Sequence, residues 1–228
     1  MRYSHRMASV WRRWRRAQIA RRRLPPSWAS LLSREFPRAE RLEATDRATL
    51  ARRLLVFLAE KRFEGAAGLK MCDEIRVLIA AQACFLVLRR SQEDYGGLHS
   101  VIVYPGEYVA RLRARDEIGL IREGSQVRLG ETSGRGAVVV SWGEARRGAQ
   151  GANGGRNLVF HEFAHLLDAE SGGFDGAPRL DQRSAYDRWS RVMREEYEAL
   201  RARAAAGVPT DINPYATTSP AEFFAVAT

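Results

Sequence analysis

The spacing of apolar residues predicts helices in both halves of the chain. Leu50, Leu54, Phe57 and Leu58 recur at helical spacing, in a segment that we expect to be helical over residues 45–64 and to end at Gly65. The same period predicts further helices at 27–36, 71–90, 156–169 and 184–206, with a last helix beginning at Ser219.

The pattern changes between residues 99 and 142. Three short β-branched runs, at 99–104, 127–129 and 137–142, are bounded by Gly, Pro and Ser, which predicts strands. Helices before and after a small sheet indicate an α+β fold. We therefore expect a mostly helical single domain with a small mixed sheet beside the helix at 156–169.

The basic charge of the chain is concentrated at one end. Of 228 residues, 37 are Lys or Arg and 27 are Asp or Glu, a net charge of +10, and nine of the arginines lie within residues 1–23. We expect residues 1–23 to be a flexible basic arm and residues 24–228 to form the domain. Trp11 and Trp14 stand among these arginines, a composition that suits a lipid interface or phosphates, although a solvated terminus is the simpler interpretation.

Several features argue against secretion or membrane insertion. Cys72 and Cys84 fall on one expected helix, roughly 18 Å apart, too far for a disulfide. No apolar segment follows the basic start, as a signal peptide would require. The longest apolar stretch, Val77 to Leu88, is interrupted by Gln82 and is shorter than the ~20 residues of a membrane span. We expect a cytoplasmic protein.

The chemistry-bearing motif is HEFAH at residues 161–165. On a helix, His161 and His165 share one face, so both imidazoles can bind one metal ion, with Glu162 beside the open coordination position. Zinc requires neutral imidazole ligands and, in a catalytic site, a position left for water. The motif therefore predicts one zinc ion, whereas two histidines on a polar helix face would be the alternative.

The residue pattern leaves the third protein ligand open. A third histidine of the metzincin type would stand at position 171, where the chain has Ser171, so a carboxylate from a later helix is expected. Glu222 has another explanation, as the returning member of a capping box that begins at Ser219. The candidates on spacing alone are Glu195, Glu196, Glu198 and Glu222.

A family resemblance narrows this choice. The segments FLAEKRFEG, IAAQACFLVL, VIVYPGEYV, VVVSWGEARRG, NLVFHEFAHLLD and PYATTSPAEFFAV resemble the Mlc titration factor A (MtfA) family of zinc peptidases, over roughly residues 28 to 228. The resemblance implies that His161, His165 and Glu222 are the zinc ligands and that Glu162 is the general base. It also implies a gluzincin-like fold, similar to the catalytic domain of lethal-factor-type toxin proteases.

Two further residues near the motif have more than one interpretation. The family pattern has a tyrosine at Tyr215, whose hydroxyl would stabilise the oxyanion formed during peptide hydrolysis; the alternative is a loop tyrosine packed on the core. Asp168 lies three residues after His165, where it would either orient a ligand or face solvent.

These features together predict a zinc-dependent peptidase. Glu162 would take a proton from water, which attacks a peptide carbonyl, and would pass that proton to the leaving amine, with Tyr215 assisting. The strand run at 138–142 is either the sheet edge that binds the peptide or protein substrate, or an interior core strand.

The family name suggests an alternative function. In this interpretation the chain is a regulatory protein that binds and sequesters a transcription repressor, with weak or vestigial peptidase activity. The chain stops at Thr228, six residues after Glu222, whereas the resemblance implies further C-terminal structure. We therefore expect a domain truncated at its C-terminus, with a final helix prone to fray.

Overall fold

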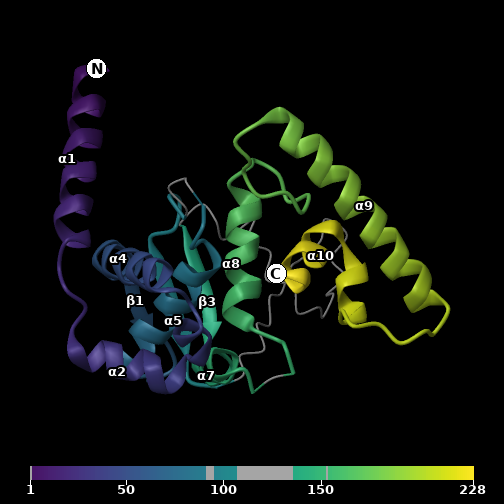
Figure 1. Ribbon diagram of the computed structural model, residues 1–228, viewed down its shortest axis with the longest axis horizontal. Helices are drawn as coiled ribbons and strands as arrows, with labels where there is room; N and C mark the ends of the chain where they lie inside the picture. Colours follow the sequence, from purple (N-terminus) through teal and green to yellow (C-terminus); the bar gives the residue numbers. More distant parts are fainter. Residues whose placement is uncertain (1, 91–94, 107–135, 153) are drawn as a thin grey trace, which may run out of the picture.

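The computed structural model describes residues 2–90, 95–106, 136–152 and 154–228, with side chains from residue 10 onward. The expected strand at 127–129 lies outside these ranges. Along the chain the elements are α1 (Arg2–Ala20), α2 (Pro26–Glu35), α3 (Pro37–Glu40), α4 (Ala44–Glu60), β1 (Arg62–Gly65), α5 (Asp73–Leu86), β2 (Ser100–Tyr104), β3 (Ala137–Ser141), α7 (Trp142–Gln150), α8 (Leu158–Ala169), α9 (Arg183–Ala205), the 3-10 helix η2 (Pro214–Thr218) and α10 (Pro220–Ala227) (Figure 1). The expected α+β class with mostly helical content is confirmed.

The sheet corrects one expectation. Its three described strands run in the order β1-β2-β3, and both pairings are parallel, so the described sheet is not mixed. Strand β1 lies in the last part of the segment that helical spacing assigned to a helix, because α4 ends at Glu60. There Lys61 turns away and its Nζ donates to the carbonyls of Tyr95 and Leu98, both at 2.7 Å, which holds the chain beside β2.

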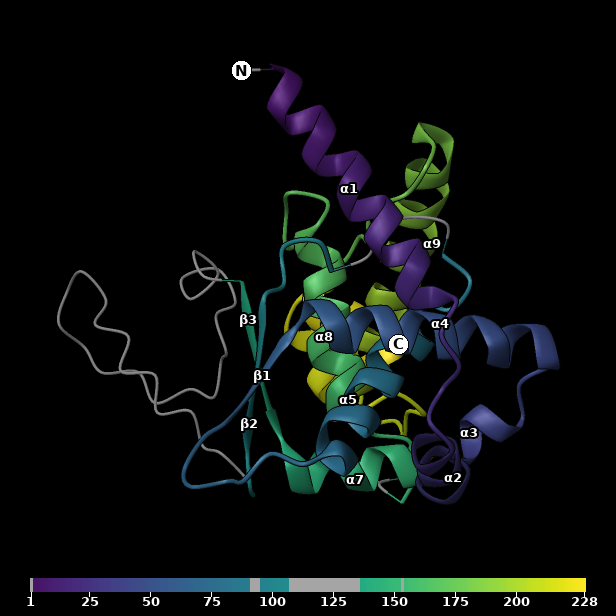
Figure 2. The same cartoon turned by 90° about the vertical axis from the view of Figure 1, so that its left-hand side faces the viewer.

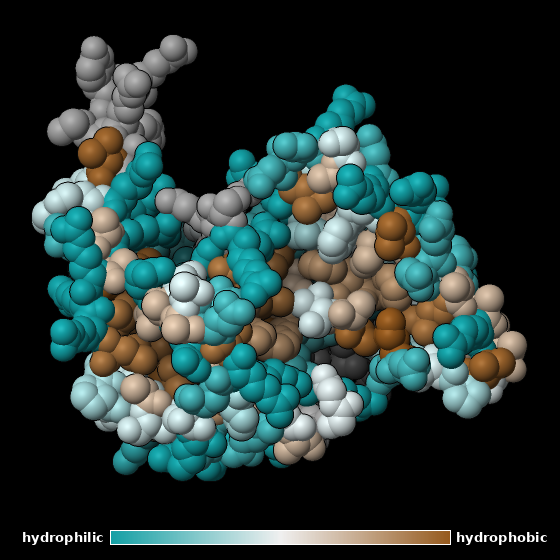
Figure 3. Space-filling view, in the orientation of Figure 1, coloured by the Kyte–Doolittle hydropathy of each residue, from teal (hydrophilic) through white to brown (hydrophobic). Residues whose placement is uncertain are grey.

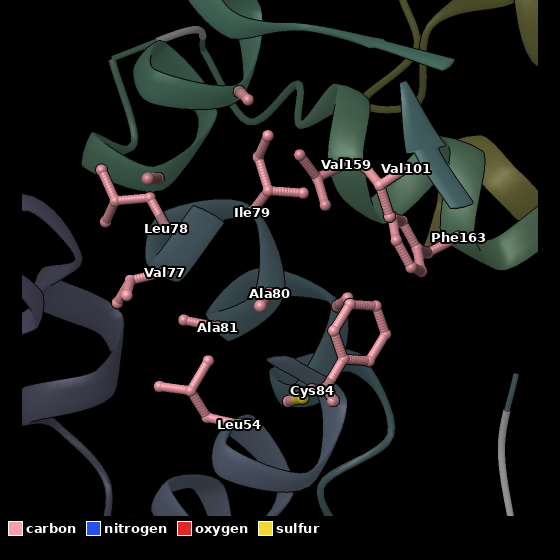
Figure 4. Close-up of a cluster of buried hydrophobic side chains, with 14 of the residues drawn as sticks. Leu54, Val77, Leu78, Ile79, Ala80, Ala81, Cys84, Val101, Val159 and Phe163 are labelled. Atoms are coloured by element: carbon pink, nitrogen blue, oxygen red, sulfur yellow. The ribbon is translucent and has the colours of Figure 1, made fainter. Parts of the chain in front are cut away.

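The main core forms around α5, which is buried on nearly all sides. Val77, Leu78 and Ile79 are fully enclosed, between α2 and α4 on one side and α7 and α8 on the other (Figure 4). In β2 the alternate residues Val101 and Val103 are buried, so one face of the sheet completes this core. In Figure 2 the helices α4, α5 and α8 lie on one side of the strands.

The basic arm is helical over residues 2–20 and contacts the rest of the molecule through its end. Ile19 is buried, and Arg16 donates to both carboxylate oxygens of Glu60 at 2.6 Å, which joins α1 to α4. The N-terminal half of α1 extends beyond the neighbouring elements in both ribbon views (Figures 1 and 2).

The last three elements, α9, η2 and α10, form what we call the C-terminal unit, with a small core of its own. Leu200, Ala216 and Phe223 bury one another there. A second small cluster, Ala164 with Phe224 and Ala225, joins this unit to α8. Figure 1 shows α8 standing between the main core and the C-terminal unit.

None of the described helices combines the length and the apolar character of a membrane span.

Candidate metal centre

One face of helix α8 packs in the main core, and another face carries the two histidines of the HEFAH motif. Val159, Phe163 and Leu167 recur every four residues and are buried in the main core, where the Phe163 ring meets Tyr95 edge-on at 5.0 Å. His161 and His165 are also four residues apart, and each stands two positions after a buried residue of this face. They therefore project from the helix roughly 200° around its axis from the buried face. The apolar contacts therefore fix which way both imidazoles point, toward α10 of the C-terminal unit.

A buried polar network fixes the start of α8. The side-chain oxygen of Asn157 accepts the Phe160 N–H at 3.0 Å and caps the helix. Its amide nitrogen donates to Gln82 Oε1 at 2.8 Å, and Gln82 Nε2 donates to the carbonyls of Leu78 and Ala145. Because all these groups are paired, Gln82 can be fully buried within apolar α5 and can position the helix that carries His161 and His165.

The third candidate ligand enters from the first turn of α10. Ser219 Oγ accepts the Glu222 N–H at 3.2 Å, and Pro220 occupies the first turn, so the expected N-cap is formed. Phe223 and Phe224 are buried, and Phe224 contacts Ala164 of α8. With these two residues packed inward, the Glu222 side chain is turned to the two histidines.

The structure brings His161, His165 and Glu222 together at a spacing suited to zinc. The two Nε2 atoms lie 3.3 Å apart; Glu222 Oε2 lies 3.3 Å from His161 Nε2, and the other carboxylate oxygen, Oε1, lies 3.5 Å from His165 Nε2. Tetrahedral zinc with bonds of about 2.0–2.1 Å holds its ligand atoms about 3.3–3.4 Å apart. In the part of the chain that the structure describes, these three residues are the one cluster of His, Cys, Asp or Glu side chains close enough to hold a metal ion together. The other carboxylates considered, Glu195, Glu196 and Glu198, lie exposed on α9.

The electrostatics of the group also fit a cation. Glu222 Oε2 is buried without a hydrogen-bond partner, which is costly unless a positive charge lies nearby. Burial alone would raise the pKa of Glu222, but the two imidazoles outweigh it and lower the pKa to about 2. Burial lowers the pKa of His161, and the Glu222 and Glu162 carboxylates more than offset this and raise it.

Glu162 and Tyr215 are far apart in the sequence, but both lie near the Glu222 carboxylate. Glu162 is buried, which raises its pKa, although the charges of His161 and His165 offset part of the shift. Tyr215 is the second residue of η2, and its N–H donates to Asn213 Oδ1 at 2.9 Å. Partial burial and the nearby Glu222 raise the pKa of Tyr215, so its hydroxyl keeps its proton at neutral pH.

Asp168 has a role that neither sequence interpretation anticipated. It is fully buried, so it does not face solvent, and its carboxylate accepts the N–H groups of Gly176 at 3.0 and 3.1 Å and of Ala177 at 3.0 Å. The Gly176 carbonyl in turn accepts from Trp189 Nε1 at 2.9 Å. Asp168 thus holds the loop after α8 against α9.

That loop also contacts the helix that carries Glu222. Gly176 has φ +79°, and a Cβ atom there would lie 2.5 Å from the carbonyl oxygen of Pro220. The close approach of Gly176 to Pro220 therefore locates the first turn of α10 relative to α8. Sequence reasoning missed this loop and the Gln82–Asn157 pair; a glutamine inside an apolar helix was the available signal for the pair.

Comparisons with known proteins agree with this geometry. Residues 11–228 match the profile of the family described as glucose-regulated metallo-peptidase M90, so the similarity begins within α1 and not near residue 28. An uncharacterized protein of Synechocystis sp. is 36% identical over 219 residues, covering 96% of this chain and 80% of that protein. Mlc titration factor A of Klebsiella pneumoniae (strain 342) is 31% identical over 207 residues, covering 87% and 74%. Mlc titration factor A of Pectobacterium atrosepticum is 31% identical over 173 residues, covering 75% and 64%. The chain belongs to this M90 metallopeptidase family, the family of Mlc titration factor A.

Proposed function

We propose that this chain is a zinc-dependent peptidase that hydrolyses peptide bonds with His161, His165 and Glu222 as the zinc ligands. The observation that carries the proposal is the convergence of two imidazole nitrogens and one carboxylate from two helices distant in sequence, with one ligand atom from each residue lying within 4.8 Å of the others. Membership of a metallopeptidase family supports it independently. When bound there, zinc would polarise the peptide carbonyl and lower the pKa of water.

Glu162 is the proposed general base. It follows His161 directly on α8, and its burial raises its pKa toward the range in which a carboxylate both takes and returns a proton. In the proposed reaction Glu162 takes a proton from the attacking water and then gives it to the leaving amine. The C–N bond breaks as the amine receives that proton, so no other acid is needed.

Tyr215 is the proposed oxyanion donor. Its raised pKa keeps the hydroxyl protonated, and 45% of the residue is exposed, which leaves it accessible to a substrate. A protonated hydroxyl can donate to the negative oxygen that develops as water attacks the carbonyl.

Strand β3 is the proposed site for the substrate backbone. It contacts α8 and comes last in the order of the described strands, so the side opposite β2 has no strand partner among the described residues. An extended peptide can add to such an edge through its backbone hydrogen bonds. The inward-facing Val138 and Val140 remain core residues in this arrangement.

The test compares Glu162→Gln with the wild type. We expect the variant to keep one zinc ion per chain, measured by native mass spectrometry, and to cleave a peptide library about 10²- to 10⁴-fold more slowly. Glu195→Gln, on an exposed part of α9, is the matched control and should retain full activity. Cleavage by Glu162→Gln at the wild-type rate would exclude Glu162 as the base. Glu222→Ala should lower zinc content, and unchanged stoichiometry would exclude Glu222 as a ligand.

The relatives' names support a second candidate function. Several are called Mlc titration factor A, so binding of a transcription regulator is a proposal for this chain as well. A pull-down with purified Mlc, using the wild type and Glu162→Gln, tests it. Retention by both proteins without cleavage of the regulator would support a binding function that is separate from hydrolysis, and no retention would reject it.

A further inference from the structure

Helix α1 carries an apolar face that the rest of the described molecule leaves uncovered. Val10, Trp11 and Trp14 are 63%, 61% and 58% exposed. At 3.6 residues per turn, Val10 and Trp14 lie roughly 180° and 140° around the helix from buried Ile19, the residue that faces α4. Figure 3 shows apolar (brown) surface on α1, at the upper left of the molecule.

Positive charge flanks this face on both sides. Arg13 and Arg15 are exposed and fall at either edge of the arc that contains Val10, Trp11 and Trp14. The Arg15 guanidinium lies 5.8 Å from the centre of the Trp11 ring. Three more exposed arginines follow the helix at 21–23, and the chain has no acidic residue before Glu35.

We propose that α1 docks on the surface of an anionic phospholipid bilayer. A helix with tryptophans and an aliphatic residue on one face, bordered by arginines, lies in the interface between headgroups and acyl chains. Tryptophan prefers that depth because its ring is apolar and its N–H is polar, and the arginines match the negative headgroups. The helix is about 28 Å long, and its arginines exclude a spanning orientation.

The arrangement of charges favours lipid over nucleic acid. A duplex binds through arginines that point at phosphates, but the exposed arc of α1 carries Val10, Trp11 and Trp14 with one uncharged polar residue, Gln18, and Arg13 and Arg15 stand at its edges. A second copy of the chain would have to bring a like-charged helix against α1, which is unfavourable.

The docking would hold the whole domain at the bilayer. Arg16 and Glu60 join the C-terminal end of α1 to α4, and Ile19 packs beside them, so the helix and the body move together. This inference does not depend on the proposed zinc chemistry.

The experiment is vesicle flotation of the full chain. We expect binding to vesicles with roughly 30% phosphatidylserine, little binding to pure phosphatidylcholine, and a decline as salt rises. Trp11→Ala with Trp14→Ala should lower the partition coefficient about ten-fold or more. Arg13→Gln and Arg15→Gln should each lower it about five-fold. Phe174→Ala is the matched control, since Phe174 is 49% exposed but lies outside α1.

The outcomes separate the proposal from its rivals. Circular dichroism confirms that each variant is folded, and quenching of tryptophan fluorescence by brominated lipid reports insertion directly. Failure of the wild type to float with anionic vesicles would overturn the proposal. Vesicle binding that is unchanged in the variant with Trp11→Ala and Trp14→Ala would also overturn it, as would tight binding to DNA or RNA without binding to vesicles. A dimer seen by light scattering, dissociated by the same double substitution in the absence of vesicle binding, would show that this face joins two copies of the chain instead.

Discussion

Replacing Gly176 with alanine should weaken zinc binding without touching a ligand. The new Cβ would lie 2.5 Å from the Pro220 carbonyl oxygen, whereas ordinary contact begins at 3.4 Å, so the loop and the first turn of α10 must separate by about 0.9 Å. Glu222 lies two residues after Pro220 and would move with it. Metal sites tolerate errors of about 0.2 Å in ligand distance, so the displacement exceeds the tolerance several-fold.

Alanine at position 176 would also strain the backbone, and a control variant can separate this strain from the effect of the contact with Pro220. Gly176 has φ +79°, where alanine is disfavoured by about 1–2 kcal/mol. Gly172 has φ +92° in the same loop, but a Cβ there would meet nothing within 4 Å. Gly172→Ala therefore reproduces the strain of left-handed backbone without the contact with Pro220.

The assay is zinc affinity by competition with a chromophoric chelator. We expect Gly176→Ala to raise the Kd for zinc about 10- to 100-fold, the effect usual for groups that orient metal ligands, or about 1.4–2.8 kcal/mol. Gly172→Ala should stay within about two-fold of the wild type. Equal affinities for the two variants would refute the idea that the contact between Gly176 and Pro220 places Glu222.

Three further predictions follow from the site. Asn157→Ala removes the cap of α8 and leaves Gln82 Oε1 unpaired, so it should lower the free energy of unfolding by about 2–4 kcal/mol, measured with urea in the presence of chelator. Tyr215→Phe should lower kcat about 100-fold with little change in KM or zinc content, measured by steady-state kinetics. In metal-free protein, the stability lost by Glu222→Gln should be largest between about pH 4.5 and 6.5, measured by urea unfolding across pH. Below that window Glu222 becomes protonated as the pH falls toward 2, and above it His161 loses its proton as the pH passes its raised pKa.

Each of these has an outcome that contradicts it. A loss below about 0.5 kcal/mol for Asn157→Ala would mean that Gln82 finds another partner. A KM rise with constant kcat for Tyr215→Phe would point to ground-state binding. A pH-independent difference for Glu222→Gln would show that the ion pair with His161 does not stabilise the metal-free protein.

The parts of the site that depend on local spacing were predictable from the sequence. His161, Glu162 and His165 lie within five residues of one helix, and helical geometry alone puts both imidazoles on one face. The β-branched runs at 99–104 and 137–142, bounded by Gly, Pro and Ser, likewise predicted β2 and β3. In these places local sequence and tertiary packing require the same conformation.

The parts that depend on long-range packing were not predictable. Glu222 is 57 residues from His165, and its direction is set by Phe223 and Phe224 packing inward, which spacing cannot show. The capping interpretation was half right, since Ser219 does cap α10. Strand β1 was hidden because helical periodicity continued past Glu60, and the parallel strand direction follows from connections that β-propensity does not encode.

The division of the proposed ligands between two packing units has a thermodynamic consequence. The histidines belong to a helix of the main core, Glu222 belongs to the C-terminal unit, and the apolar cluster of Ala164, Phe224 and Ala225 that joins them is small. At a free zinc concentration 100 times the Kd, zinc binding would stabilise the packed arrangement of the two units by about 2.7 kcal/mol. Zinc would then act as a reversible cross-link, and the resistance of the C-terminal unit to proteolysis would follow the supply of free metal. The ion proposed for hydrolysis would then also stabilise the packing of the C-terminal unit on the main core.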